Sequence, residues 1–337
     1  MSLLLGACFR KLVVVSAVCC LLVAAAASVQ AAELKLAHFT SSKHPMDRLV
    51  MTPWSKEVAK RSNGSLTVRI FPGGALGKGP QAQYKRAADG VADITFGLQG
   101  YTSSQFPRTL LVELPGLAPD AVAATKMMWK AIGDIQGEYD RTRVVALWTN
   151  DKAVIMTRNK AVRTLDDVKG MKIRTPSKLQ GDIIKALGAT PVSMPVTKMY
   201  NALKTGVVDG LMVAPSVIRS FKIGEVAKYY TVGPFANTAF FLAMNRKAYD
   251  GLSAEHKKII DETSGEALSV KAAGIYKKAG AGSLAGEKKS GRGEVITLSD
   301  AEDKRFRKAL SGVRAATVKA LSGKGIDAEK ILAAMGG

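Results

Sequence analysis

The hydrophobic and polar positions in the first third of the chain predict strands that alternate with helices. Residues 34–39 and 66–71 show the two-residue period of a half-buried strand, and residues 94–97 form a third, more apolar segment. Helical patterns fill 47–62 and 79–90, and both end at glycine-containing turns. This strand–helix–strand–helix–strand order predicts a sheet with parallel pairs that is covered by helices.

Similar patterns continue toward the C-terminal end. We expect further strands at 144–148, 153–157, 171–175, 190–194, 211–213, 240–244 and 294–298. We expect further helices at 121–133, 165–170, 178–187, 255–265, 268–276 and 302–319. The glycines in Ala279-Gly280-Ala281-Gly282 are expected to interrupt the helical region after the helix at 268–276.

One short pattern occurs twice. Tyr84, five residues and then Gly90-Val91-Ala92-Asp93 recurs as Tyr200, five residues and then Gly206-Val207-Val208-Asp209. In both copies a helix should end at the glycine and lead into a strand that begins near the aspartate. The repetition predicts two similarly built α/β lobes, and a cleft between lobes is a preferred place for a ligand.

The N-terminal segment, residues 1–31, is expected to be a secretory signal peptide. A basic pair at 10–11 precedes an uncharged apolar run at 12–27, and small residues follow around a cleavage point. The run is shorter than the roughly 20 residues of a membrane-spanning helix. Residues 5–8 resemble a lipoprotein box, but they precede the basic pair and the apolar run, where cleavage would leave no signal. We expect no stable membrane insertion after cleavage, because no other stretch is long and apolar enough to cross a membrane.

Cysteine and charge narrow the class of protein. All three cysteines (Cys8, Cys19 and Cys20) lie inside the expected signal, as suits export to an oxidising compartment. The chain carries 49 Lys plus Arg against 28 Asp plus Glu, and without the basic pair the balance is 47 against 28, or +19. The basic residues are interspersed with acidic ones and form no aromatic-rich basic ladder, so we expect a solvated surface and no nucleic-acid partner.

The segment that ends at Arg174 is the strongest candidate for ligand chemistry. Lys172 and Arg174 alternate with apolar neighbours, and Pro176 ends the strand because it cannot donate to a sheet ladder. Arg174 therefore lies near the carboxyl end of a short strand, where ligands bind in open α/β sheets. Its guanidinium offers a planar fork that matches a carboxylate.

Other candidates come from the segments that follow strand ends. Gln99 and Tyr101 follow the third strand in a glycine-flanked segment, and the second copy has Val213, Pro215 and Ser216 at the matching place. The remaining candidates are Pro176, His38 and three aromatic residues that would by default be core: Phe39, Trp148 and Phe241.

The sequence shows no catalytic constellation. The expected mature chain lacks cysteine, and its three histidines (His38, His44 and His256) have no metal-ligand spacing. Phosphate-loop, dinucleotide-binding and nucleophile-elbow motifs are missing. Asp166 and Asp167 are adjacent acids at a helix start, where they favour the helix dipole. We therefore expect no catalytic residue, no metal and no cofactor.

Six segments together resemble a known family. They are 36–39 (Leu-Ala-His-Phe), 68–77 (Val-Arg-Ile-Phe-Pro-Gly-Gly-Ala-Leu-Gly), 90–93 (Gly-Val-Ala-Asp), 169–176 (Lys-Gly-Met-Lys-Ile-Arg-Thr-Pro), 188–192 (Gly-Ala-Thr-Pro-Val) and 206–210 (Gly-Val-Val-Asp-Gly). Nearly all of the mature chain resembles the DctP-type periplasmic solute-binding proteins of tripartite ATP-independent periplasmic (TRAP) transporters.

The resemblance implies an α/β, two-lobed periplasmic binding protein fold (type II-like), with a ligand cleft between the lobes and a long bridging helix. We expect lobe I at 32–152 with a return segment at about 241–280, and lobe II at 153–240 with C-terminal helices at about 281–337. The resemblance also implies closure over an organic acid and delivery to the permease subunits of a TRAP transporter. The arginine at the place of Arg174 typically holds the substrate carboxylate in this family.

The chain departs from the family pattern at two places. Many members carry a second arginine where this chain has Val154, with Lys152 slightly earlier as a possible cationic clamp. Where many have a polar Asn after Val-Asp-Gly, this chain has the apolar run 211–215. The pocket is therefore expected to be more apolar than one for a sugar acid. Our hypothesis is a monocarboxylate with an apolar or aromatic body, or a keto acid.

Two alternatives remain open at this stage. An exported enzyme could act on a carboxylate in the same cleft, but it would need a nucleophile or an acid–base pair beside Arg174. A ligand-sensing binding protein could present the same cargo to a receptor. Export of the mature chain implies the periplasm in each case.

Overall fold

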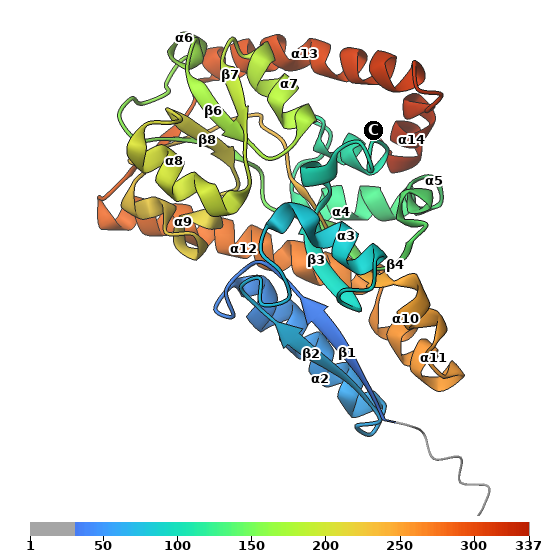
Figure 1. The fold of residues 1–337 in the computed structure, drawn as a ribbon. Helices are drawn as coiled ribbons and strands as arrows, with labels where there is room; N and C mark the ends of the chain where they lie inside the picture. The colour runs from blue at the N-terminus through green and yellow to red at the C-terminus, as the bar shows by residue number, and fades with distance from the viewer. Residues whose placement is uncertain (1–30, 337) are drawn as a thin grey trace, which may run out of the picture.

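Two β-sheets form the body of the protein. The computed structural model describes residues 31–336, so the expected signal peptide, apart from its last residue, lies outside the described residues, as do the three cysteines. The first sheet has the strand order β2-β1-β3-β10-β4, and the second has the order β11-β9-β5-β8-β6-β7. Figure 1 shows the first sheet toward the N-terminal end and the second on the opposite side of α12.

The first sheet confirms the parallel pairs predicted from the N-terminal pattern. Its strands are β1 (Ala32–Ala37), β2 (Leu66–Phe71), β3 (Ile94–Leu98), β4 (Thr142–Thr149) and β10 (Ala239–Asn245). Strand β1 pairs in parallel with both β2 and β3, whereas β10 runs antiparallel between β3 and β4. The main helices of this part are α2 (Thr52–Arg61), α3 (Gln83–Ala88), α4 (Ala121–Lys130) and α5 (Ile132–Ile135), with α10 (Arg246–Asp250) and α11 (Ala254–Thr263) after β10.

The second sheet carries the strand that ends near Arg174. Its strands are β5 (Val154–Thr157), β6 (Lys172–Thr175), β7 (Thr190–Ser193), β8 (Gly210–Val213), β9 (Tyr229–Val232) and β11 (Glu294–Thr297). Its helices are α6 (Leu165–Val168), α7 (Lys178–Ala186), α8 (Met199–Thr205) and α9 (Val217–Ser220). Strand β6 lies in parallel between β7 and β8, and β9, which the pattern did not predict, pairs with β5 and β11.

Short helical turns connect these elements. They are η1 (Asp47–Met51), a π-helical turn before α2, and the 3-10 turns η2 (Pro80–Ala82), η3 (Gln99–Thr102), η4 (Thr109–Glu113), η5 (Gln136–Tyr139), η6 (Val196–Lys198) and η7 (Ile223–Glu225). Turn η3 follows β3 directly and η6 follows β7. Both therefore lie beyond the carboxyl ends of strands, where binding residues are commonly placed.

A single long helix, α12 (Glu266–Ser290), joins the two parts. It packs on α4 and β4 of the first part and on α9 and β11 of the second (Figure 1). The expected interruption at 279–282 was therefore wrong. A glycine costs a helix only about 1 kcal/mol relative to alanine, and Gly280 is needed for packing because a Cβ there would lie 1.7 Å from Asp151 Oδ2.

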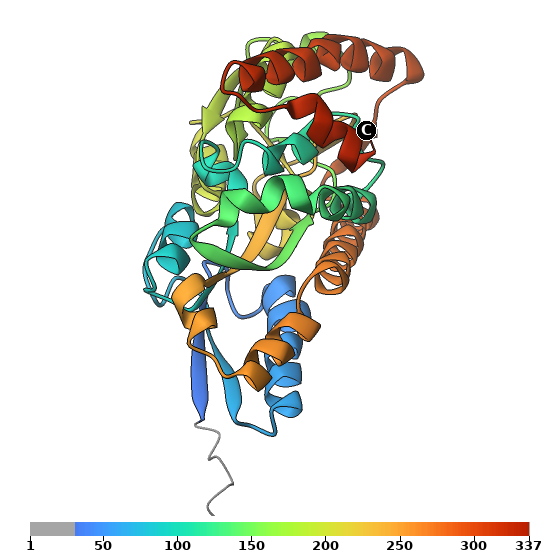
Figure 2. The ribbon, with the colours of Figure 1, turned by 90° about the vertical axis from the view of Figure 1, so that its right-hand side faces the viewer.

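The C-terminal helices complete the fold. Helix α13 (Asp300–Ser322) packs on α6 and α7, and α14 (Ala328–Met335), which the pattern did not predict, packs on α4. In Figure 2 these red helices lie at the end of the molecule away from the N-terminus. No helix within residues 31–336 combines the length and apolarity that crossing a membrane requires.

The repeated sequence pattern has the same local geometry in both copies. Gly90 and Gly206 each follow a helix with positive φ, of +74° and +77°. The Oδ2 atoms of Asp93 and Asp209 then accept hydrogen bonds from the backbone N–H groups of Lys35 and Lys172, both at 2.7 Å. Each aspartate thereby ties the start of its own strand to the parallel neighbour. In the second copy that neighbour is β6, which carries Arg174.

Candidate functional site

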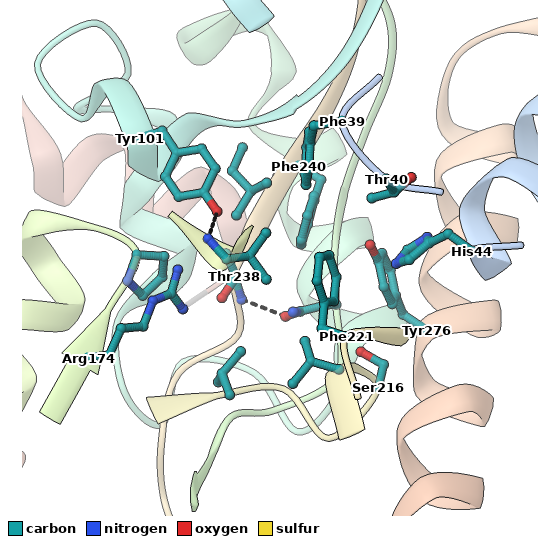
Figure 3. Close-up of a pocket in the computed structure, with 16 residues that line it drawn as sticks. Phe39, Thr40, His44, Tyr101, Arg174, Ser216, Phe221, Thr238, Phe240 and Tyr276 are labelled. Atoms are coloured by element: carbon teal, nitrogen blue, oxygen red, sulfur yellow. Dashed lines mark hydrogen bonds between the residues drawn. The ribbon is translucent and has the colours of Figure 1, made fainter. Parts of the chain in front are cut away.

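A cavity lies between the two sheets, beside the chain segments that cross from one to the other. The cavity has a volume of about 40 Å³. Most of its walls are apolar, and its lining comprises Phe39, Thr40, His44, Leu98, Tyr101, Asn150, Arg174, Pro176, Val196, Val213, Ser216, Val217, Phe221, Thr238, Phe240 and Tyr276 (Figure 3). Both sheets and α12 contribute to this lining, so the cavity depends on how the two parts meet.

Arg174 lies near the end of β6 and is only 1% exposed. Its Nε donates to the carbonyl oxygen of Met194 at 2.9 Å, which fixes the plane of the guanidinium. Its buried Nη2 has no hydrogen-bond partner among the described residues. Burial lowers the pKa of Arg174, an effect that Tyr101 opposes, but a guanidinium stays charged in proteins. A buried cationic donor without a partner is costly, so this group is suited to receive an anionic ligand.

Tyr101 spans the cavity next to Arg174. It belongs to η3, after β3 of the first sheet, and its hydroxyl accepts a hydrogen bond from the backbone N–H of Val196, beyond β7 of the second sheet, at 2.8 Å (Figure 3). Burial raises the pKa of Tyr101, so its hydroxyl stays protonated and can donate. The phenol therefore joins the two parts and places a second donor beside the guanidinium.

The two crossing segments pair with each other at the cavity. The backbone N–H of Asn150 donates to the Thr238 carbonyl at 3.0 Å, and the N–H of Thr238 donates to Asn150 Oδ1 at 2.8 Å. With Oδ1 occupied, the other side of the Asn150 amide carries the N–H donors. Asn150 and Thr238 both line the cavity, so the connection between the sheets is itself part of the site.

Aromatic side chains form the middle of the cavity. Phe39 stacks on Phe96, with ring centroids 5.4 Å apart and planes 9° apart. Phe240 stacks on Phe96 in turn at 5.6 Å, and its other neighbour is Tyr276 at 5.2 Å. Because these rings are braced by a layer of further aromatic rings, they form firm walls suited to the face of a planar apolar ligand.

His44 and Tyr276 form the end of the cavity away from Arg174 (Figure 3). Their ring centroids lie 6.1 Å apart in an edge-on arrangement, and His44 packs similarly on Phe221 at 6.0 Å. Burial, together with the nearby His38, lowers the pKa of His44 to about 3, so its ring is neutral at neutral pH. Burial raises the pKa of Tyr276 well above its ordinary value. This end is thus polar but uncharged.

Two buried carboxylates lie close to the lining residues. Glu113 Oε2 accepts a hydrogen bond at 2.8 Å from Oγ of Ser177, the residue that follows Pro176. Its Oε1 accepts a second hydrogen bond, from the N–H of Ala239 on β10, at 2.9 Å. Asp151 Oδ2 accepts from the N–H of Ser216 at 3.3 Å. Burial raises the pKa of both carboxyls to about 7. Each group ties a segment of one sheet to a segment of the other.

Of the residues expected to bind substrate, the structure brings six to the cavity. They are Phe39, Tyr101, Arg174, Pro176, Val213 and Ser216. Lys152, the possible second cationic clamp, does not line the cavity; within the lining, Arg174 is the only charged side chain. Residues 31–336 contain no group of three or more His, Cys, Asp or Glu side chains that could hold a metal ion.

Five other expected residues lie outside the lining. Trp148 is buried and stacks on Phe96 at 5.6 Å, and Gln99 Nε2 donates to the Tyr139 hydroxyl at 2.8 Å. Phe241 points to the opposite face of β10 from Phe240, because successive strand residues alternate, and its ring packs on Tyr84 and Phe106.

His38 and Pro215 complete this group. The Nε2 of His38 is 2.9 Å from Asp47 Oδ2 and its Nδ1 is 2.9 Å from Thr40 Oγ1, so the ring braces the loop that carries His44. Pro215 is buried in the turn that leads into α9, and its carbonyl accepts from the N–H of Ile218 at 3.0 Å. The five residues of this group are thus buried core or structural residues.

Sequence reasoning did not find several lining residues. Asn150 follows the strand predicted at 144–148, so the rule that selected Tyr101 could have selected it as well. The two-residue period of 240–244 offered Phe240 and Phe241 on opposite faces without showing which face meets the cavity. His44 and Tyr276 carried no signal, because their placement depends on how the loop before α2 and helix α12 pack.

Comparison with known proteins places the chain in a family. The model of the family described as bacterial extracellular solute-binding protein, family 7, matches residues 36–319. The chain is 27% identical over 247 residues to the 2,3-diketo-L-gulonate-binding periplasmic protein of Escherichia coli K12. This match covers 72% of this chain and 74% of the Escherichia coli protein.

Two solved structures are similar in fold and sequence. One is a TRAP solute-binding protein from a marine metagenome, from an unidentified microbe, specific for aromatic acid ligands and in complex with metahydroxyphenylacetate (TM-score 0.86, 30% identity, 90% of this chain and 96% of that chain covered). The other is a TRAP solute-binding protein from Rhodoferax ferrireducens T118 in complex with copurified benzoate (TM-score 0.86, 27% identity, the same coverage).

These comparisons agree with the two-sheet fold and its long bridging helix, and the family is one of binding proteins rather than enzymes. This chain belongs to the DctP family of bacterial extracellular solute-binding proteins, the solute-binding proteins of TRAP transporters.

Proposed function

We propose that this protein binds a monocarboxylate with an aromatic body in the periplasm and delivers it to the permease subunits of a TRAP transporter. The observation that carries the proposal is the buried Nη2 of Arg174, which has no hydrogen-bond partner within residues 31–336 and belongs to a residue that lines an apolar cavity. A carboxylate would supply the missing acceptor and the opposite charge together.

The charge of the lining favours one carboxylate rather than two. Arg174 is the only charged side chain within the described lining, and Lys152 is not part of it. A second buried carboxylate would have no cation to offset the loss of its hydration, and that loss costs several kcal/mol. The site therefore disfavours dicarboxylates.

The walls favour an aromatic body over a polyhydroxylated one. Phe39, Phe221 and Phe240 line the middle of the cavity, and such rings offer no acceptor or strong donor to sugar hydroxyls. Each sugar hydroxyl buried against them would lose hydrogen bonds with water. The aromatic acids bound by the two similar solved proteins support the same ligand class.

Contacts across the cavity supply a mechanism for capture. The hydrogen bonds from the Val196 N–H to the Tyr101 hydroxyl and from Ser177 Oγ to Glu113 Oε2 join the two parts. A ligand that contacts both sides adds further contacts of this kind and shifts an open–closed equilibrium toward the closed form. The permease would then recognise the surface of the closed, loaded protein.

Thermal unfolding with a panel of acids tests the ligand class. Benzoate at 100 times its Kd should stabilise the protein by about 2.7 kcal/mol, which raises the Tm of a chain of this size by roughly 4 °C. Succinate and D-galactonate at the same concentration should raise Tm far less. Stabilisation by galactonate but not by benzoate would contradict the proposal. Small-angle scattering that showed equal compactness with and without bound benzoate would contradict closure.

A further inference from the structure

The end of the cavity away from Arg174 makes a specific chemical demand. His44 and Tyr276 both line it, and Figure 3 shows them together, across the phenylalanine rings from Arg174. A ligand whose carboxylate meets the guanidinium would extend its far side toward this pair. The hydrogen-bonding groups of these two side chains therefore determine which substituent of the ligand this end can accept.

His44 offers a neutral donor. Its Nδ1 accepts a hydrogen bond from the backbone N–H of Met46 at 3.2 Å, so the proton of the neutral ring is on Nε2. The ring is held edge-on between Phe221 and Tyr276. Because the ring carries no charge at neutral pH, it can donate to a neutral oxygen but cannot balance a second carboxylate.

Tyr276 offers both a donor and an acceptor. It is 4% exposed and lines the cavity, and burial raises the pKa of its hydroxyl, which therefore stays protonated. Buried tyrosine hydroxyls usually find a partner. Its position on α12 is fixed by packing with Phe240, at 5.2 Å between ring centroids.

We infer that His44 and Tyr276 recognise a hydroxyl group on the ring of the ligand, so that the preferred substrates are hydroxylated aromatic monocarboxylates. The ligand hydroxyl would accept from His44 Nε2–H and donate to the Tyr276 oxygen. This inference rests on the proposed function, because it takes the carboxylate to lie at Arg174. It adds a second point of recognition, which orients the ring and sets selectivity among aromatic acids.

The arrangement also explains which analogues the site should reject. A site built to hydrogen-bond a substrate hydroxyl discriminates against the analogue that lacks it, because its own polar groups then remain unpaired. Two neutral hydrogen bonds of ordinary net strength correspond to a preference of about tenfold or more. A second carboxylate at this end would meet two neutral groups, so benzene dicarboxylates should bind more weakly than benzoate.

Calorimetric titration with four probes tests the inference: benzoate, 3-hydroxybenzoate, 4-hydroxybenzoate and isophthalate. The better hydroxybenzoate should bind the wild-type protein about tenfold or more tightly than benzoate, and isophthalate should bind more weakly than benzoate. If benzoate binds and neither hydroxybenzoate binds more tightly, the inference fails while the proposed function stands. If none of the aromatic acids binds, the proposed function itself fails.

Variants assign the preference to the two side chains. Tyr276→Phe and His44→Phe should each reduce the ratio of the benzoate Kd to the hydroxybenzoate Kd to about threefold or less. Tyr249→Phe is the matched control, because its hydroxyl bonds Asp261 at the surface, and it should keep the wild-type ratio. Thermal unfolding checks that each variant folds. A wild-type ratio in both folded cavity variants would overturn the assignment. If one of the two variants does not fold, the ratio measured in the other still tests the assignment.

Discussion

The close approach of helix α12 to Asp151 makes Gly280 a position where one methyl group should matter. A Cβ built on Gly280 would lie 1.7 Å from Asp151 Oδ2 and 2.5 Å from its Cγ. Ordinary contacts of this kind begin beyond 3 Å, so the carboxylate or the helix must move in Gly280→Ala. Asp151 is buried and bonded to Ser216, which restricts that movement.

Gly282, on the same helix, isolates the effect. A Cβ there meets nothing within 4 Å, so Gly282→Ala should show only the gain in helix propensity, up to about 1 kcal/mol. Gly280→Ala has the same gain but also an overpacking cost of about 1–3 kcal/mol. The two variants should therefore differ in unfolding free energy by about 1–3 kcal/mol, with Gly280→Ala the less stable.

Urea denaturation followed by circular dichroism measures this difference. The double variant Gly280→Ala with Asp151→Ala should recover part of the loss, with a coupling energy of at least about 0.5 kcal/mol. Because Tyr276 lies one turn before Gly280 and lines the cavity, Gly280→Ala should also weaken ligand binding. Equal stability of the two alanine variants, or strict additivity in the double variant, would refute this account of the packing.

Three further predictions concern the supports of the site. Burial raises the folded-state pKa of Asp151 to about 7, above its unfolded value of about 3.9. The protonated carboxyl therefore stabilises the folded state at low pH, and this contribution to the unfolding free energy is lost as pH rises through 7. Between pH 5 and pH 8, unfolding free energies from urea titration should therefore fall by about 2–3 kcal/mol more in the wild type than in Asp151→Asn; equal pH dependence would contradict this. Asp93→Ala and Asp209→Ala each remove one hydrogen bond of the same length to a strand. Each should therefore lower the unfolding free energy by roughly 0.5–1.5 kcal/mol. A much larger loss for one of them would show that the two copies of the repeated sequence pattern are not equivalent. Phe241→Leu should lower Tm by removing core contacts yet leave the benzoate Kd within twofold by calorimetry, and a large loss of affinity would show that Phe241 acts at the site.

The alternating fold and the position of Arg174 could be predicted from local pattern. The two-residue period at 34–39 and 66–71 and the stop at Pro176 are local signals, and the strands β1, β2 and β6 follow them closely. The repeat could be predicted for the same reason, because Gly90 and Gly206 meet a backbone need that is set within a few residues.

Helix α12 and the far end of the cavity could not be predicted in this way. Whether glycines end a helix or let it pack closely depends on what faces them, and only the fold brings Asp151 to Gly280. His44 and Tyr276 meet from loops and helices more than two hundred residues apart in the chain. Trp148 shows the converse, since its strand and its default place in the core could be predicted but the aromatic stack in which it lies could not.

The central claim is that the guanidinium of Arg174 binds the carboxylate of the ligand, and calorimetric titration of benzoate into Arg174→Ala tests it most directly. Loss of a desolvated charge partner costs roughly 2–5 kcal/mol, so the affinity should fall by about 30-fold or more. Arg143→Ala is the control, because Arg143 lies at the surface and pairs with Asp261, and it should bind benzoate as the wild type does. A benzoate Kd in folded Arg174→Ala within about twofold of the wild-type value would contradict the account.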